Sequence, residues 1–168
     1  MTYKIAFVGK AGSGKTTLAE YLVKKHGFRK FSFADAVKEI AYKYFGMVKK
    51  DRDLLQAIGE KLREIDKDVW IKILLAKLDV ADYVHAVVDD CRYLNEAKAL
   101  RDRGFILIKL GGSHKTLTLQ QRKHSSEREV DQIVENYFLD TNKPLEETYQ
   151  ELEEILKNTG GRWKIVGD

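Results

Sequence analysis

Residues 9–16 read Gly9-Lys10-Ala11-Gly12-Ser13-Gly14-Lys15-Thr16 and decide how the chain folds. They fit the pattern G-x-x-x-x-G-K-[ST], a glycine-rich loop whose backbone N–H groups turn inward around phosphate. A short apolar run, 3–8, precedes the loop, and the segment 15–26 that follows carries apolar residues at helical spacing. A strand, a phosphate loop and a helix in this order predict an anion-binding site at the start of the helix.

The parts of this loop have chemical roles that the motif predicts. Lys15 is expected to reach the β- and γ-phosphates of ATP, and the Thr16 hydroxyl is expected to bind Mg²⁺. Ser13 and Thr17 carry weaker signals, and helix capping accounts equally well for a serine at position 13. The predicted ATP-binding residues are Gly9, Lys10, Ala11, Gly12, Ser13, Gly14, Lys15, Thr16 and Thr17.

The rest of the chain alternates between strand-like and helix-like segments. The predicted strands are 3–8, 29–33, 83–88, 105–110 and 137–139, and the predicted helices are 15–26, 34–45, 53–64, 68–78, 94–103 and 144–157. Strands that alternate with helices favour a parallel sheet with right-handed crossovers. We therefore expect an α/β fold with helices on both faces of the sheet.

Length and composition limit the classes of protein that the chain can represent. Its 168 residues suit one domain, and 43% apolar with 33% charged residues is a globular balance. A net charge of +4 is too weak to argue for nucleic acid, but it suits phosphorylated ligands. The single cysteine excludes an internal disulfide, and the apolar run before Gly9 is too short for a signal peptide or a membrane span. We expect a cytoplasmic protein whose partners are small-molecule nucleotides; a homodimer stays open.

Two carboxylates and an arginine follow the predicted strand 83–88. Asp89 and Asp90 would lie at the carboxyl end of a parallel strand, over the crevice where ligands bind, and either could hold Mg²⁺. Aspartate is also common in ordinary turns, so a turn without a ligand remains the alternative. Arg92 could stabilise the charge of a transferring phosphoryl group, or it could simply form an ion pair with the neighbouring acids.

Several stretches resemble the deoxynucleoside monophosphate kinases of bacteriophages, relatives of the nucleoside monophosphate kinases. These are FSFADAVK at 31–38, GEKLREIDKDVW at 59–70, DDCRYLNE at 89–96 and HSSE at 124–127. The phosphate loop is common to many NTPases, whereas D-x-R-x-x-N-E followed by H-x-S-E is more selective. Cys91, Tyr93 and Ser125 depart from the family pattern, which has Val, Phe and Pro at those positions.

The resemblance implies a single three-layer P-loop kinase domain over residues 1–168. It would contain a helical acceptor-binding insert at about 34–80 and a lid at about 111–130. The activity implied is transfer of the γ-phosphoryl group of ATP, with Mg²⁺, to a (deoxy)nucleoside 5′-monophosphate. A P-loop kinase for another small acceptor, such as dephospho-coenzyme A or a nucleoside, is one alternative. An NTP-binding regulatory or nucleic-acid-associated module is another, although no aromatic-and-basic ladder supports it.

The resemblance also assigns roles to individual residues. Within D-x-R it favours Asp90 over Asp89 for the metal. The implied catalytic residues are Lys15, Arg92, Arg122 and Arg128, and the metal ligands are Thr16, Asp89 and Asp90. The implied substrate-binding residues are Phe33, Asp35, Lys38, Arg63, Trp70, Arg92, Glu96, Ser126 and Glu127.

Structural explanations compete with several of these assignments. Arg63 suits an acceptor phosphate because its guanidinium forms two parallel hydrogen bonds, but it could instead pair with a neighbouring acid on its helix. The basic lid could be a solvated loop. For Trp70 a core or wall position is favoured over base stacking. His124 lacks the neighbours of a zinc site, and with Glu127 it is expected to order the lid or contact the nucleotide.

Overall fold

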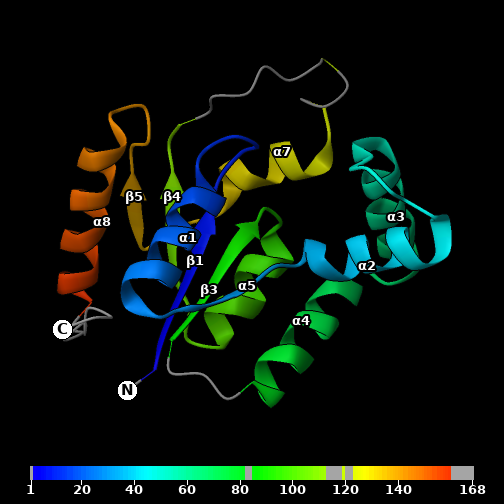
Figure 1. Ribbon diagram of the computed structural model, residues 1–168, viewed down its shortest axis with the longest axis horizontal. Coiled ribbons are helices and arrows are strands. Elements are labelled where there is room, and N and C mark those ends of the chain that lie inside the picture. The colour runs from blue at the N-terminus through cyan, green and yellow to red at the C-terminus, as the bar shows by residue number, and fades with distance from the viewer. Residues whose placement is uncertain (1, 82–84, 113–118, 120–122, 160–168) are drawn as a thin grey trace. The chain divides into compact units, whose positions relative to one another are not determined.

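The computed structural model describes residues 2–81, 85–112, 119 and 123–159 (Figure 1). Its strands are β1 (Tyr3–Val8), β2 (Arg29–Phe31), β3 (His85–Cys91), β4 (Ile106–Leu110) and β5 (Tyr137–Leu139). They form one sheet in the order β2-β3-β1-β4-β5, and β1 pairs in parallel with both β3 and β4. The β4–β5 pair is parallel as well, so the predicted parallel α/β sheet is confirmed.

The helices are α1 (Lys15–His26), α2 (Ala34–Phe45), α3 (Arg52–Ile65), α4 (Val69–Val80), α5 (Leu94–Asp102), α7 (Ser125–Glu129) and α8 (Leu145–Asn158). All the predicted helices are present within a few residues of their expected bounds. Helix α7 and the 3₁₀ turn that follows it, Val130–Gln132, were not predicted. A helix of five residues is too short to show a helical period in the sequence. Within the described ranges, no helix has both the length and the hydrophobicity to cross a membrane.

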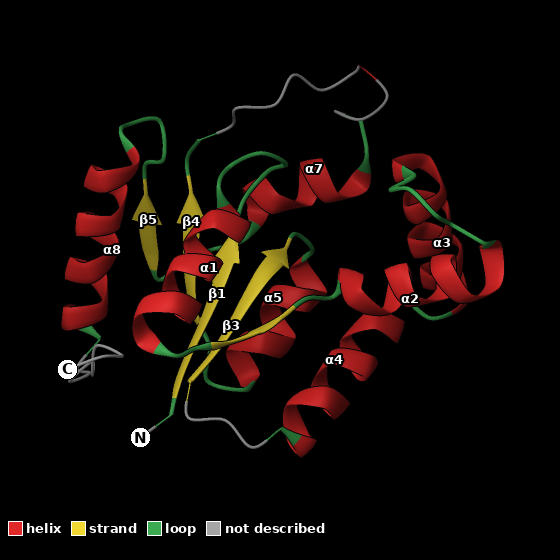
Figure 2. Cartoon of the chain, viewed as in Figure 1, coloured by secondary structure: helices red, strands yellow, loops and turns green. Residues whose placement is uncertain are grey.

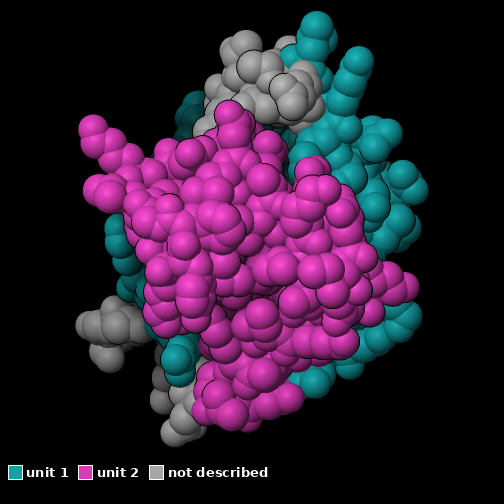
Figure 3. Space-filling model, turned by 90° about the vertical axis from the view of Figure 1, so that its right-hand side faces the viewer, with its two compact units in different colours: residues 1–30, 83–168 teal, residues 31–82 magenta. Residues whose placement is uncertain are grey.

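The chain divides into two compact units, which Figure 3 colours separately. Unit 1 contains residues 1–30 and 83–168, and unit 2 contains residues 31–82. The predicted acceptor insert, 34–80, falls within unit 2. Of the predicted lid, residues 113–118 and 120–122 lie outside the described part of the chain.

The core of unit 1 lies between the sheet and two helices. Ile5 and Phe7 of β1 are fully buried and belong to one cluster with apolar residues of α1 and α8, including Leu18, Leu22 and Leu152. Neighbouring residues of a strand point to opposite faces, so the equally buried Ala6 and Val8 face the other side of the sheet. Helix α5 contacts β4, and Figure 2 shows α1 and α5 on opposite faces of the sheet. The helices therefore cover both faces, as predicted.

A polar cluster ties α1 to α8. The Tyr21 hydroxyl donates to Glu153 Oε1 at 2.6 Å, and His26 Nε2 lies 2.8 Å from the same oxygen. Burial alone would raise the pKa of Glu153, but hydrogen bonds from Tyr21, His26 and Lys25 outweigh it and lower the pKa to about 2. Since the amino-terminal end of α1 follows the phosphate loop directly, this cluster helps to fix the helix on which the loop is built.

The carboxyl end of β3 carries the chain's single thiol. Cys91 is fully buried, and burial raises the pKa of its thiol well above the usual range, with a further contribution from Glu96 and Asp90. A protonated, enclosed thiol is chemically inert. Cys91 is therefore a packing residue beside the site.

The segment after β5 supports the phosphate loop from behind. The buried Thr141 hydroxyl donates to the backbone oxygen of Ser13 at 2.8 Å. This approach requires glycine at position 112, because a Cβ there would overlap Thr141 Oγ1 and would lie 3.1 Å from the Thr141 carbonyl carbon. The glycine pair after β4 thus has a packing role, and Asn142 Nδ2 adds a hydrogen bond to the Gly111 oxygen at 3.4 Å.

Replacing Gly112 with alanine tests this support. We expect Gly112→Ala to lower the free energy of unfolding by about 1–3 kcal/mol, the usual cost of overpacking a buried site. Gly59→Ala is the control: no atom lies within 4 Å of a Cβ at this helical position, so a gain of about 0.5–1 kcal/mol is expected. Urea unfolding, monitored by circular dichroism, measures the free energy of unfolding of both variants. Equal stability of the two variants would contradict the packing role of Gly112.

Candidate phosphate-binding site

The loop from Gly9 to Gly14 connects the end of β1 to the start of α1. Gly12 and Gly14 have φ values of 76° and 98°, in the left-handed region that favours glycine. Gly14 is the N-cap of α1, so the capping explanation of Ser13 is wrong. Ser13 is instead fully buried, and its Oγ accepts a hydrogen bond from Lys15 Nζ at 3.4 Å.

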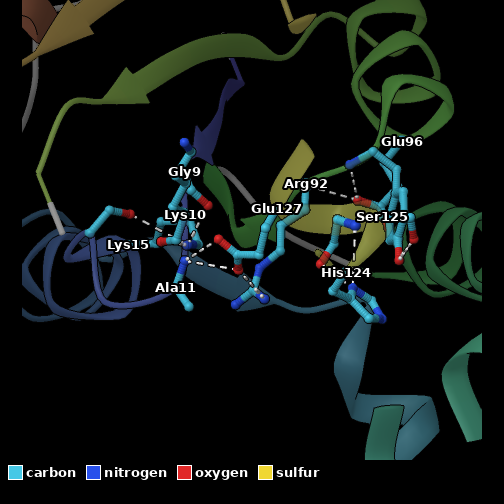
Figure 4. A network of polar contacts seen from close by, with 12 residues as sticks. Gly9, Lys10, Ala11, Lys15, Arg92, Glu96, His124, Ser125 and Glu127 are labelled. Atoms are coloured by element: carbon cyan, nitrogen blue, oxygen red, sulfur yellow. Dashed lines mark hydrogen bonds and ion pairs between the residues drawn. The ribbon is translucent and has the colours of Figure 1, made fainter. Parts of the chain in front are cut away.

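Lys15 lies buried at the start of α1. Its Nζ donates to the backbone oxygens of Gly9 and Lys10, each at 2.7 Å (Figure 4). Burial, together with the nearby charge of Arg92, lowers the pKa of Lys15 from 10.5 to about 7, against the raising effect of three carboxylates. Those carboxylates are Glu127, Asp90 and Asp89. The ammonium group is thus held in place by the loop, in surroundings where a further negative charge would stabilise it.

The predicted metal ligands meet beside the loop. The Thr16 hydroxyl donates to Asp89 Oδ2 at 3.3 Å, and Lys30 Nζ lies 3.8 Å from the same oxygen. A hydroxyl and a carboxylate are the hard oxygen donors that Mg²⁺ prefers, so the residues present fit the ion. The resemblance favoured Asp90, whereas the geometry favours Asp89 as the partner of Thr16. Asp90 is half-buried, and its negative charge acts to raise the pKa of Lys15.

Arg92 follows β3, and its position is set by the start of α5. The backbone N–H groups of Arg92 and Tyr93 donate to Glu96 Oε2 at 2.9 and 3.1 Å. This arrangement caps α5 and accounts for the burial of Glu96, for which the resemblance implied a substrate contact. The Arg92 guanidinium lies 3.6 Å from Glu127 Oε1, and its Nε is buried without a hydrogen-bond partner among the described residues.

Helix α7 brings Glu127 to the phosphate loop. The Ala11 N–H faces both carboxylate oxygens of Glu127, at 3.3 and 3.4 Å (Figure 4). His124 is the N-cap of α7, because its Nδ1 accepts from the Ser126 N–H at 3.2 Å and lies 2.7 Å from the Ser126 hydroxyl. The buried Ser126 therefore contacts the capping residue His124, which gives its hydroxyl a structural role. His124 thus caps the short helix α7, and its two expected roles, ordering the lid or contacting the nucleotide, stay predictions.

The remaining predicted residues of unit 1 have more open surroundings. Thr17 and Arg128 are exposed, and Arg122 lies outside the described residues. Lys10 forms an exposed ion pair with Asp131 at 3.0 Å. Sequence reasoning missed Thr141; the only hint of it was the glycine pair after β4.

Unit 2 contains five of the nine predicted substrate-binding residues, and each is described within that unit alone. Phe33 is buried, Asp35 and Lys38 are exposed on α2, and Arg63 is half-buried on α3. Trp70 is buried on α4 and its indole N–H donates to the Gly59 oxygen at 3.1 Å. The burial of the ring and the use of its only donor favour the core interpretation of Trp70 over a base-stacking platform.

Comparison with known proteins places this site in a wider group. A family model described as an AAA domain matches residues 5–129. The chain is 28% identical over 134 residues to the uncharacterized protein ORF77 of Ictalurid herpesvirus 1 (strain Auburn), an alignment that covers 76% of this chain and 59% of that protein. It is 27% identical over 191 residues to an Acanthamoeba polyphaga mimivirus protein provisionally named a deoxynucleotide monophosphate kinase, covering 92% and 96%.

A solved structure shares the fold. Shikimate kinase from Acinetobacter baumannii, in complex with shikimate, superposes with a TM-score of 0.60 at 19% sequence identity, covering 94% of this chain and 95% of that chain. Its likeness agrees with the α/β P-loop kinase-like fold described above. The AAA domain model covers most of the chain, including the phosphate loop, and the chain therefore belongs to the AAA domain family.

Proposed function

We propose that the protein transfers the γ-phosphoryl group of ATP to a nucleoside 5′-monophosphate, with deoxynucleotides as the favoured acceptors. One observation carries the proposal: the Ala11 N–H and the Arg92 guanidinium lie at the buried Glu127 carboxylate, whose charge also acts on the Lys15 ammonium. Phosphoryl transfer needs little more from a protein than such preorganised positive charge. The name of the mimivirus relative supports the choice of acceptor.

Thr16 and Asp89 would hold Mg²⁺ in this proposal. The ion, when bound, supplies charge that neutralises the phosphate oxygens. The chain's own groups then bind and orient the triphosphate: the loop amides hold its oxygens, and Lys15 and Arg92 stabilise the charge that develops on the transferring group. Arg63 would bind the phosphate of the acceptor, a role that suits the geometry of a guanidinium group.

A coupled ADP-release assay with ATP, Mg²⁺ and single acceptors tests the proposal. The four common dNMPs and the four NMPs are tried one at a time, and we expect rapid release with one or two of them. Lys15→Ala should lower kcat/KM by roughly 100-fold or more, since it removes a preorganised charge at the phosphates. Lys24→Ala, which changes an exposed lysine of the same helix, should stay within about twofold of the wild type.

Slow release at one rate with every acceptor, and also without acceptor, would mean a bare NTPase and would refute the proposal. Consumption of ATP with a nucleoside or with dephospho-coenzyme A alone would assign the site to another small acceptor. Product analysis distinguishes both of these outcomes from the proposed reaction, because only a monophosphate kinase converts its acceptor into a nucleoside diphosphate.

The pKa of Lys15 predicts that nucleotide binding takes up a proton. Free Lys15 has a pKa of about 7, lowered first by burial, and phosphates beside it favour the charged form and raise the pKa again. Below about pH 6 Lys15 is protonated in both the nucleotide-free and the nucleotide-bound protein. At about pH 8 it gains up to one proton when nucleotide binds. The affinity for nucleotide therefore falls by up to about tenfold per pH unit above 7. Calorimetric titration with MgATP in buffers of different ionisation enthalpy measures this uptake, which Lys15→Ala should abolish.

Arg63 gives a separate test of the acceptor assignment. Arg63→Ala should raise the KM of the monophosphate by roughly tenfold or more and leave the KM of ATP within about twofold, because a charge-assisted pair of hydrogen bonds to phosphate is lost. Arg63→Lys keeps the charge but loses the paired hydrogen bonds, so an intermediate KM is expected. Lys61→Ala, on the same helix, is the control, since its ion pair with Glu64 is exposed. An unchanged monophosphate KM in Arg63→Ala would remove Arg63 from the acceptor site.

A further inference from the structure

Glu127 places a negative charge inside the phosphate loop. Its side chain is 5% exposed, and both carboxylate oxygens face the Ala11 N–H. The loop amides of this motif are the groups that bind phosphate oxygens in P-loop proteins. A carboxylate that accepts from one of them occupies a donor that a phosphate would otherwise use.

The other neighbours of Glu127 also belong to the proposed phosphate site. Arg92 Nη1 lies 3.6 Å from Glu127 Oε1, and the charge of Glu127 is the largest of the effects that raise the pKa of Lys15. The buried Arg92 Nε, without a hydrogen-bond partner among the described residues, is a further donor that a phosphate oxygen could use. The carboxylate thus balances the same two cations that a triphosphate would balance (Figure 4).

Helix α7 is held by contacts that do not depend on the Glu127 carboxylate. Ser125 Oγ lies 3.2 Å from the Tyr93 hydroxyl, and Glu129 Oε2 accepts from the Leu94 N–H at 3.0 Å. His124 caps the same helix. The Glu127 side chain could therefore leave the loop amide while these anchors keep α7 in place.

We propose that Glu127 is a positioning residue that occupies the phosphate loop in the nucleotide-free protein, holds the Arg92 guanidinium against it, and is displaced when nucleotide phosphates bind. This inference rests on the proposed function, because it takes the loop as the site of a nucleoside triphosphate. Glu127 competes with the phosphates for the Ala11 N–H and for the charge of Arg92. If a ligand binds only molecules whose loop is open, its apparent affinity equals the intrinsic affinity multiplied by the fraction of molecules in that state.

Binding of anions in the absence of acceptor tests the competition. Inorganic pyrophosphate and MgATP are titrated calorimetrically into the wild type, Glu127→Gln and Glu146→Gln. Glutamine keeps the shape of the side chain and removes its charge, so Glu127→Gln should bind both ligands roughly tenfold more tightly. Glu146→Gln alters an exposed carboxylate of α8, which takes no part in holding α7, and should stay within about twofold of the wild type.

Unchanged or weaker binding of both ligands by a folded Glu127→Gln protein would overturn the inference, as a purely structural role for Glu127 predicts. If that variant does not fold, Glu127→Asp serves instead: it keeps the charge on a shorter side chain that reaches the loop less well, so tighter binding is again expected. The proposed function is tested separately. Tighter binding without transfer to any acceptor would refute that function and leave the inference standing, whereas transfer with unchanged affinity would overturn the inference alone.

Discussion

The buried ammonium of Lys15 is the interaction on which the rest of the site depends. Removing a cation from water is costly, and the protein offsets this cost with backbone oxygens and with nearby carboxylates. Two loop carbonyls accept hydrogen bonds from Nζ, which fixes the path of the loop around the side chain. Asp89, Asp90 and Glu127 act on the same charge from β3 and α7. Three segments that are distant in sequence are therefore organised around one nitrogen atom.

The backbone around that nitrogen is supported on two sides. Thr141 holds the loop through the Ser13 oxygen, and Glu127 holds it through the Ala11 N–H. The two contacts differ in kind. The hydroxyl of Thr141 binds a backbone oxygen, which cannot donate to a phosphate, whereas Glu127 binds a loop N–H, the kind of donor that holds phosphate in such loops. On the proposals above, the first contact would persist when a nucleotide binds, and the second one would be exchanged.

Sequence reasoning succeeded where the information lies in consecutive residues. The phosphate loop is eight neighbouring residues, and the strands and helices around it show their periods over similar lengths. It failed for contacts between segments distant in the chain. Ala11 and Glu127 are 116 positions apart, and Ser13 and Thr141 are 128 apart, so neither pairing leaves a local pattern. The choice between Asp89 and Asp90 depended on a one-residue register, which only the folded strand could supply.

The enclosed thiol of Cys91 has a practical consequence. It is the single cysteine of the chain, fully buried, and burial raises its pKa, so thiol-directed reagents will not reach it in the folded protein. A cysteine introduced at an exposed position, such as Arg128 on α7 or Lys38 on α2, would be the only reactive thiol. Fluorescent or spin labels can therefore be attached at one chosen residue without first removing a native cysteine, and movements of either unit become directly observable.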